Sequence, residues 1–428
     1  ASATLDAEGF RDFFEEGVGA DGKPCATSSA ILTLAGSGTH PVKWHFLEQP
    51  VPDYLAYAVE AVQQIHASGD PGDVLLFLTG QQEVDAACKL LSDSQQQGSS
   101  RSGGKGKGSG GGPQHLVVLP LYSSLSAKAQ LKVFEPAGRN ARKIVVATNI
   151  AETSLTIDGI VHVVDCGFAK QRYAHPSGEE ALVIAPISQA SARQRAGRAG
   201  RSRPGNYYAL MTEASFDSLP LQTSPEMQRC SLSSVVLSLK ALGVDNVLRF
   251  DFLSPPPPQS LANALEALYA LGALDGSGKL TNPRGESMAL LPLDPQPAAF
   301  LLSAEKEGCE EEALTLAAVL SVQSPFNTLK PADLKVAQAP FAAYEGDAIT
   351  FLNVVSAYHK QQRKHGARKA SQWCRKRLLN ERVLERIGEV RQQLGKHLAA
   401  HHRRAAEAEG GAGGGAAAES RSKKKKGG

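Results

Sequence analysis

The sequence predicts an α/β domain with a mainly parallel sheet, followed by a region that is almost entirely helical. Two observations predict this order. Between residues 70 and 211, short apolar runs alternate with helical patterns, which is typical of β-α-β units. After about residue 222, apolar residues recur every three or four positions, which indicates helices.

Six apolar runs are predicted to be strands. Runs such as VLLFL and IVVA contain no polar residue, and such runs suit parallel strands that are covered on both faces. After the first run, Val84, Cys88 and Leu91 share one helix face, so we expect a helix there. The predicted strands are Val74–Leu78, Leu116–Pro120, Ile144–Ala147, Val161–Asp165, Leu182–Ala185 and Tyr207–Met211.

The region near 222–290 is predicted to be a winged helix. Apolar residues recur at helical spacing across 232–242 and 261–271, and a glycine that can end a helix follows each run. The sequence DGSGKLT at 275–281 then indicates a turn that leads into a strand, which would form a small wing. Further helices are expected at 297–306, 310–321, 346–359 and 372–399.

Charge is distributed unevenly along the chain. The net charge is +3, yet residues 359–428 hold 19 Lys/Arg and 6 Asp/Glu and so carry +13, which leaves about −10 for the rest. Such a segment is typical of binding to nucleic acid or to an acidic partner; a solvated helix face with a disordered tail is the alternative. Two low-complexity stretches are predicted to be flexible, a Gly/Ser insert at 98–112 and a basic tail at 400–428.

Several classes of protein are disfavoured by composition. The six cysteines are scattered without a C-x-x-C pair, so neither a zinc site nor a disulfide framework is expected. No apolar run approaches the roughly 18 residues of a membrane span. The first residues, Ala1–Thr4, include no initiator Met, so we expect that a preceding domain is missing.

The strongest chemical signal is QRAGRAGR at 194–201. Its three arginines are spaced by three, which would place them on one side of a helix, and the small residues between them would allow close backbone approach. Guanidinium groups held in this way can clamp a phosphoryl group. The alternative is a basic surface helix that begins with a capping box formed by Ser191 and Gln194.

This segment resembles motif VI of the DEAH-box helicases of superfamily 2. Residues 145–160 (VVATNIAETSLTIDGI) are similar to motif V of that family. Residues 75–84 resemble motif IV, except that Gln82 stands where an acidic residue is usual. Further similarities are LPLYSSL (119–125) to motif IVa, Ser2-Ala3-Thr4 to motif III, residues 225–275 to the winged helix, and GDAITFLNV (346–354) with Trp373-Cys374 to the ratchet domain.

The resemblance implies a nucleotide site. Arg198 and Arg201 would be arginine fingers on the phosphates of ATP, and Gln194 would orient the attacking water. Thr156 and Asp158 would contact the ribose and neighbouring atoms. The resemblance gives Phe134 the place of the aromatic residue that stacks on the base. A core phenylalanine at a helix end is the alternative for Phe134.

The resemblance also implies contacts with RNA. Ser123, Thr148 and Asn149 would hold the sugar-phosphate backbone; for Thr148 and Asn149 the alternative is that they only shape a strand-to-helix turn. Ser2 and Thr4 would couple ATP hydrolysis to RNA movement. Residues 168–185 would form a strand-separating β-hairpin, in which Tyr173 and His175 are either functional or plain hairpin residues.

The 428 residues contain neither a G-x-x-x-x-G-K-S/T phosphate loop nor a DEAH box. The resemblance therefore implies that Mg²⁺ is held by a first RecA-like domain that is missing, and this chain offers no metal site of its own. By itself the chain is expected to hydrolyse little ATP. The domains implied are the end of a first RecA-like domain (1–41), a second RecA-like domain (42–221), the winged helix (222–290), a helical ratchet domain (291–399) and the tail (400–428).

The leading hypothesis is an ATP-dependent RNA helicase that remodels RNA or RNA-protein complexes in splicing or ribosome assembly. Its partners would be single-stranded RNA and ribonucleoprotein factors, and Lys423–Lys426 favours a nuclear location over the cytoplasm. The second hypothesis is a non-catalytic RNA-binding or regulatory fragment. A third is a DNA helicase of the same superfamily, which the wording of motif V and the winged-helix region disfavour.

Overall fold

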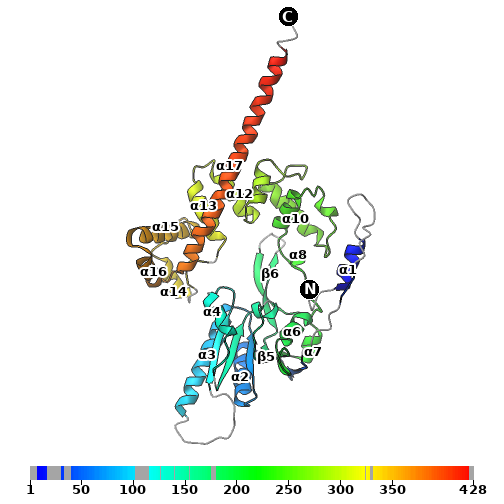
Figure 1. The fold of residues 1–428 in the computed structure, drawn as a ribbon, viewed down its shortest axis with the longest axis vertical. Coiled ribbons are helices and arrows are strands. Elements are labelled where there is room, and N and C mark those ends of the chain that lie inside the picture. The colour runs from blue at the N-terminus through cyan, green and yellow to red at the C-terminus, as the bar shows by residue number, and fades with distance from the viewer. Residues whose placement is uncertain are drawn as a thin grey trace. The chain divides into compact units, whose positions relative to one another are not determined.

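The structure, a computed structural model, forms two compact units (Figure 1), Ala1–Cys230 and Ser231–Gly428. It describes residues 7–16, 30–32, 40–101, 115–125, 127–138, 140–153, 155–174, 180–322, 324–327 and 331–423. No helix in these ranges is both long enough and apolar enough to cross a bilayer. The first described element, α1 (Ala7–Glu16), lies in the first unit.

The first unit contains a six-stranded sheet in the order β1-β8-β5-β2-β4-β3, in which all neighbouring strands are parallel. This confirms the predicted parallel sheet. One strand was not predicted, because β1 is an edge strand in which Lys43 and His45 alternate with Trp44 and Phe46, so it has no continuous apolar run. The strands are β1 (Val42–Leu47), β2 (Asp73–Phe77), β3 (His115–Leu121), β4 (Ala141–Ala147), β5 (Ile160–Asp165) and β8 (Gly205–Thr212).

Helices cover both faces of this sheet. On one face, α2 (Tyr54–Ala67) and α3 (Gln81–Arg101) pack on alternate residues of the strands, among them Leu76 and Val146. On the other face, α5 (Ile150–Thr153), α6 (Gln189–Ala196) and the 3₁₀ turn η1 (Lys132–Phe134) pack on the residues between, such as Val145. The short helix α4 (Ala127–Leu131) directly precedes η1. Burial on both faces explains why the central strands contain continuous apolar runs such as 74–77 and 144–147.

An antiparallel hairpin, β6 (Phe168–Ala174) with β7 (Glu180–Pro186), follows β5. It confirms that residues 168–185 form a hairpin and that Leu182–Ala185 is a strand, and this strand belongs to the hairpin instead of the parallel sheet. The apolar side chains of this run are largely exposed instead of buried between helices. Tyr173 is 40% exposed, and His175 lies outside the described residues.

The first unit ends with α7 (Glu213–Asp217) and α8 (Glu226–Arg229). The second unit begins with the predicted winged helix: α9 (Ser233–Ala241), η2 (Val247–Arg249), α10 (Pro258–Ala270) and α11 (Arg284–Leu290). Between α10 and α11 an antiparallel bridge joins Leu274 to Leu280. The turn of this wing is closed by Asp275, whose carboxylate accepts hydrogen bonds from the backbone N–H groups of Ser277 and Lys279. The order of two helices and a wing is thus confirmed, whereas the predicted domain boundaries stay predictions.

The ratchet region consists of helices, as predicted, but the predicted helix at 372–399 is divided. The chain breaks between α16 and α17, where Leu378 adopts a positive φ of 57° and Leu379 forms an antiparallel bridge with Phe326. Leu379 is 3% exposed, so burial of this side chain offsets the interruption of the helix. The helices are α12 (Pro295–Ala304), α13 (Glu310–Leu320), α14 (Pro331–Gln338), α15 (Asp347–His365), α16 (Ala367–Lys376) and α17 (Glu381–Lys423).

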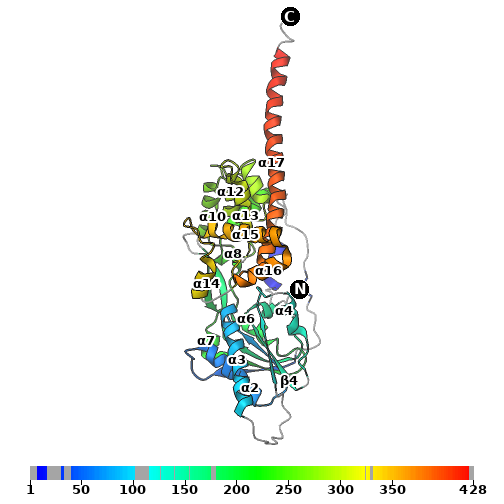
Figure 2. The same cartoon turned by 90° about the vertical axis from the view of Figure 1, so that its left-hand side faces the viewer.

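Two segments that were predicted to be flexible are partly helical. Helix α17 continues through most of 400–428 as far as Lys423, as Figures 1 and 2 show. Helix α3 extends to Arg101, into the first four residues of the 98–112 insert. Low apolar content excludes a packed core but not a helix, since Ala, Glu and Lys are themselves good helix formers. Residues 102–112 of the insert lie outside the described residues.

Gly200 packs against the segment that leads into β1. A Cβ atom on Gly200 would lie 2.5 Å from the carbonyl oxygen of His40 and 2.8 Å from Val42, and the carbonyl of Gly200 accepts a hydrogen bond from the backbone N–H of His40 at 2.7 Å. Gly200 therefore confirms the close backbone approach expected of this motif, whereas a Cβ on Gly197 would make only ordinary contacts.

We expect Gly200→Ala to lower the free energy of unfolding by about 1–3 kcal/mol, because the added methyl group overpacks a backbone contact. Gly138→Ala is the matched control, since a Cβ there would meet nothing within 4 Å. Urea denaturation followed by circular dichroism would measure both variants. Equal stability of the two variants would contradict this packing.

Candidate functional site

The QRAGRAGR segment does not form one continuous helix. Helix α6 ends at Ala196, and Arg198 and Arg201 follow in turns. The prediction that three arginines line one side of a helix was therefore wrong. The predicted capping box was also wrong, because the N-cap is Ser188, whose hydroxyl accepts a hydrogen bond from the backbone N–H of Ser191.

Arg195 faces the core instead of the site. It is 1% exposed, and its guanidinium donates to Asp165 Oδ1 at 2.7 Å and to Glu152 Oε2 at 2.9 Å. Burial alone would lower the pKa of Arg195, but the two carboxylates outweigh it and raise the pKa. Tyr207 donates to the other oxygen of Asp165 at 2.7 Å. Asp165 ends β5 and Glu152 lies in α5. The ion pairs of Arg195 with these two residues therefore fix α6 and α5 to the sheet.

Sequence reasoning missed the role of Arg195, although a signal existed. Ala192, Ala196 and Ala199 are all buried, so the small residues of the motif mark the side that faces the sheet. Arg195 lies between them and must point the same way. An acidic residue at the end of a buried strand, here Asp165, is the natural partner.

Arg198 and Arg201 lie beside the loop that joins α5 to β5. Arg198 donates to the carbonyl of Leu155 at 2.8 Å and to that of Glu152, and Arg201 donates to the hydroxyl of Thr156. Burial, and then the charge of Arg201, lower the pKa of Arg198. Two neighbouring guanidinium groups repel each other, and an anion placed between them would relieve that repulsion.

Phe134 and Asp158 are brought together by a lysine that sequence reasoning did not single out. Lys143 is 1% exposed, and its ammonium donates to the carbonyls of Val133 at 2.9 Å, Glu135 at 3.1 Å and Asp158 at 3.4 Å. Phe134, which lies between the first two acceptors in the sequence, is 39% exposed. The structure thus favours an accessible aromatic surface over the alternative of a core phenylalanine.

The predicted RNA contacts follow the carboxyl ends of β3 and β4. These strands end side by side, with Leu121 paired to Ala147, and the backbone N–H of Thr148 donates to the carbonyl of Leu121 at 3.1 Å. Ser123 and Asn149 are exposed there and Thr148 is half-buried. Carboxyl ends of parallel strands are where open α/β sheets bind ligands.

The turn after β2 belongs to the same edge. Glu83 accepts hydrogen bonds from the backbone N–H and the hydroxyl of Thr79 at 3.1 and 2.7 Å and from Tyr54 at 2.6 Å. Burial, and then the carboxylate of Glu83, raise the pKa of Tyr54 to about 12, so Tyr54 stays a donor at neutral pH. Ser124 donates to Gln81 at 2.8 Å, which links the turn to the loop after β3.

The remaining predicted residues are placed as follows. Gln194 is half-buried in α6. Ser2 and Thr4 lie outside the described residues, so their proposed coupling role stays a prediction. Within the described ranges, no group of three or more His, Cys, Asp or Glu side chains could hold a metal ion.

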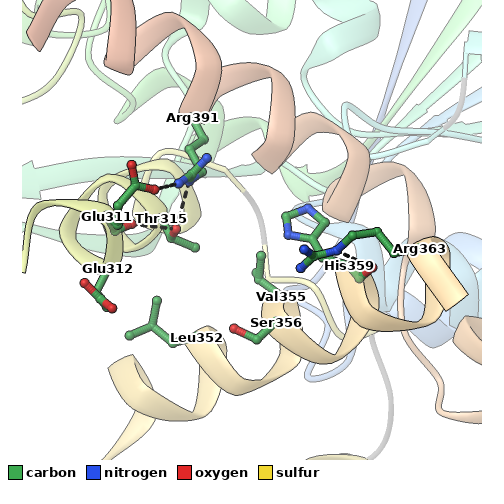
Figure 3. Close-up of a pocket in the computed structure, with 9 residues that line it drawn as sticks. All are labelled: Glu311, Glu312, Thr315, Leu352, Val355, Ser356, His359, Arg363 and Arg391. Atoms are coloured by element: carbon green, nitrogen blue, oxygen red, sulfur yellow. Dashed lines mark hydrogen bonds and ion pairs between the residues drawn. The ribbon is translucent and has the colours of Figure 1, made fainter. Parts of the chain in front are cut away.

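A separate hollow of about 360 Å³ lies in the second unit (Figure 3). It is bordered by α13, α15 and α17, and three of its lining residues, His359, Arg363 and Arg391, belong to the basic segment 359–428 that was predicted to bind nucleic acid or an acidic partner. On one wall Arg391 of α17 donates to Thr315 at 3.0 Å and pairs with Glu311 of α13. On the other wall, burial and then Arg391 and Arg363 lower the pKa of His359. The contacts of Arg391 with Thr315 and Glu311 attach α17 to α13.

The comparisons with known protein families all match domains of helicases. Residues 57–203 match the helicase conserved C-terminal domain, residues 264–293 the winged-helix part of the helicase-associated domain, and residues 294–381 its ratchet-like part. The crystal structure of the E. coli DExH-box NTPase HrpB is similar with a TM-score of 0.55 and 32% identity, over 69% of this chain and 35% of that one.

The sequence is 48% identical over 402 residues to the probable ATP-dependent RNA helicase DHX35 of Pongo abelii and of Homo sapiens, which covers 93% of this chain and 53% and 54% of theirs. It is 43% identical over 399 residues to the pre-mRNA-splicing factor ATP-dependent RNA helicase prp22 of Schizosaccharomyces pombe, over 92% of this chain and 31% of that protein. The chain thus spans about half or less of the length of these relatives. It belongs to the DEAH-box RNA helicase family.

We expect Arg195→Met to lower the free energy of unfolding by about 3–5 kcal/mol, because it leaves the buried Asp165 without its cation. Arg193→Met, on the exposed side of α6, is the matched control and should change stability little. Chemical denaturation of both variants measures the difference. A loss of less than about 1 kcal/mol for Arg195→Met would contradict a structural role for the pair.

Proposed function

We propose that this chain is the second motor half, with the accessory domains, of an ATP-dependent RNA helicase. The observation that carries the proposal is the position of Arg198 and Arg201. Both converge on the loop that holds Thr156, and this loop continues into Asp158, which Lys143 ties to the segment of Phe134. The loop of Thr156 and Asp158 therefore contacts Arg198 and Arg201 and is also linked, through Lys143, to the segment of the exposed Phe134.

The chemistry of these groups suits ATP. Arg198 and Arg201 would neutralise charge on the phosphates, Phe134 would stack on the base, and Thr156 and Asp158 would meet the ribose. Base stacking tolerates any nucleobase, so weak nucleotide preference is expected. Gln194 would orient the attacking water.

On the RNA side, Ser123, Thr148 and Asn149 would contact the sugar-phosphate backbone at the carboxyl edge of the sheet. Contacts with phosphate and sugar carry no base information, which suits a motor that moves along RNA of any sequence. The hairpin β6–β7 would separate strands. Cycles of ATP binding and hydrolysis would then move RNA relative to this half of the motor.

The cellular setting is inferred from the relatives. The S. pombe relative is named as a pre-mRNA-splicing factor, and this supports remodelling of RNA or RNA-protein complexes in splicing, with ribonucleoprotein partners and a nuclear location. The basic run Lys423–Lys426 fits that location. Ribosome assembly is the competing process.

The alternative function is a non-catalytic RNA-binding fragment. It is favoured by the +13 charge of residues 359–428 and by the absence of the phosphate-loop pattern from these 428 residues. The chain by itself should show little RNA-stimulated ATP hydrolysis under either hypothesis. Only the helicase hypothesis predicts that Arg198 and Arg201 matter for hydrolysis in a longer protein.

In a full-length helicase that contains this chain, Arg198→Ala or Arg201→Ala should lower ATP hydrolysis by about 10³-fold or more, because an arginine finger stabilises the charge that develops in the transition state. RNA affinity should be largely retained. Arg193→Ala, an exposed arginine of the adjoining helix, should leave hydrolysis unchanged. Steady-state ATPase rates within about threefold of wild type for both finger variants would refute the assignment.

The chain itself should bind single-stranded RNA weakly, without sequence preference, and less tightly as salt rises. Replacing Arg375 and Lys376, both exposed, with alanine should reduce the slope of log affinity against log salt by about 1.4, or 0.7 per lost phosphate contact. Alanines at the exposed, uncharged Gln392 and Gln393 are the matched control. Fluorescence anisotropy with several unrelated RNA oligomers measures this. A flat salt response, or a preference above about tenfold for one sequence, would contradict nonspecific backbone binding.

A further inference from the structure

The segment that connects β3 to β4 also connects the two halves of the candidate site. It leaves β3 at the loop of Ser123, a proposed RNA contact, and passes through α4 and η1 to Phe134, the proposed base contact. The RNA contact thus follows the carboxyl end of β3. Phe134 is tied, by contrast, to Lys143 near the amino end of β4. Because the two strands are parallel, this segment runs back along the length of the sheet.

Gln130 of α4 fixes the RNA end of the segment. Its amide nitrogen lies 3.3 Å from the carbonyl of Tyr122, 3.4 Å from that of Ser123 and 3.1 Å from that of Leu125. All three partners can only accept, so the amide nitrogen must face them. One half-buried side chain therefore gathers the backbone on both sides of Ser123 and attaches it to α4.

Lys143 fixes the nucleotide end in the same manner. Its buried ammonium gathers the carbonyls on either side of Phe134 and that of Asp158. The adjoining Val133 is fully buried, so η1 is also held by packing. A buried ammonium without these acceptors would be strongly unfavourable, and this makes a shift of η1 without Lys143 costly.

We propose that α4 and η1 form a coupling element that links nucleotide occupancy at Phe134 to the conformation of the Ser123 loop, with Gln130 and Lys143 as its positioning residues. The proposal rests on the proposed function, because it takes Ser123 and Phe134 as RNA and nucleotide contacts. Stacking of a base on Phe134 favours one position of η1, and the helical connection and Gln130 transmit that position to Ser123. By linkage, RNA bound at Ser123 affects nucleotide affinity equally.

The test uses a full-length helicase that contains this chain. Gln130→Met keeps the length of the side chain but removes its N–H donors. RNA stimulation is the ratio of kcat with saturating RNA to kcat without RNA. We expect this ratio to fall at least about fivefold in Gln130→Met, whereas kcat without RNA should change less than about twofold. A non-hydrolysable ATP analogue should also shift the RNA Kd of the variant less than it shifts that of wild type.

Two further variants keep the proposal falsifiable. Lys143→Met should raise the KM for ATP both with and without RNA, in addition to reducing stimulation. Lys132→Met changes an exposed lysine of η1 and should retain wild-type coupling. Stimulation and analogue-linked RNA affinity within about twofold of wild type in Gln130→Met would overturn the inference, as would an equal loss in Lys132→Met. If the wild-type helicase itself showed no RNA-stimulated hydrolysis, the proposed function would fail as well, so the two failures are distinguishable.

Discussion

The buried guanidinium of Arg195 holds the candidate site in place. A cation that is 1% exposed has lost its hydration, and only nearby negative charges and hydrogen bonds can offset that loss. Arg195 has two such partners, Asp165 of the sheet and Glu152 of α5. Because α5 is fixed in this way, the carbonyl of Glu152 is available to hold Arg198. The position of the proposed finger Arg198 therefore depends on the neighbouring Arg195, whose side chain is buried in the core.

In the first unit, several side-chain nitrogen donors each form hydrogen bonds with two or more backbone carbonyls. Lys143 does so at Phe134, Gln130 at Ser123, and Arg198 at the loop after α5. Loops carry most of the candidate site, and loops have carbonyl groups without partners in regular structure. These donors, which lie in a strand, in a short helix and in the turn after α6, satisfy the carbonyl groups, so loop residues are held in defined positions.

The second unit contrasts with the first in its charge. From residue 348 to residue 380 it contains eight Lys/Arg and no Asp/Glu. Among the ion pairs of the described residues, one arginine of α17 pairs with an acidic residue of another helix. This is the half-buried Arg391, which pairs with Glu311 of α13. This distribution leaves a cationic surface on α15 and α16 that can meet phosphates, whereas the pair Arg391–Glu311 serves to attach α17 to α13 (Figure 3).

The sequence by itself determined the parallel sheet, the winged helix, the helical ratchet region and the motifs of the family, because continuous apolar runs, helical periodicity and motif spacing are local features. It did not determine which arginines of QRAGRAGR face the core, since burial of Arg195 depends on Asp165 and Glu152, which are 30 and 43 residues away in the chain. The break at Leu378 required Phe326, and the roles of Lys143 and Gln130 required the loops that they contact. These features were decided by tertiary structure alone, because each one exists only where segments distant in sequence satisfy one another's charge, hydrogen bonds or apolar surface.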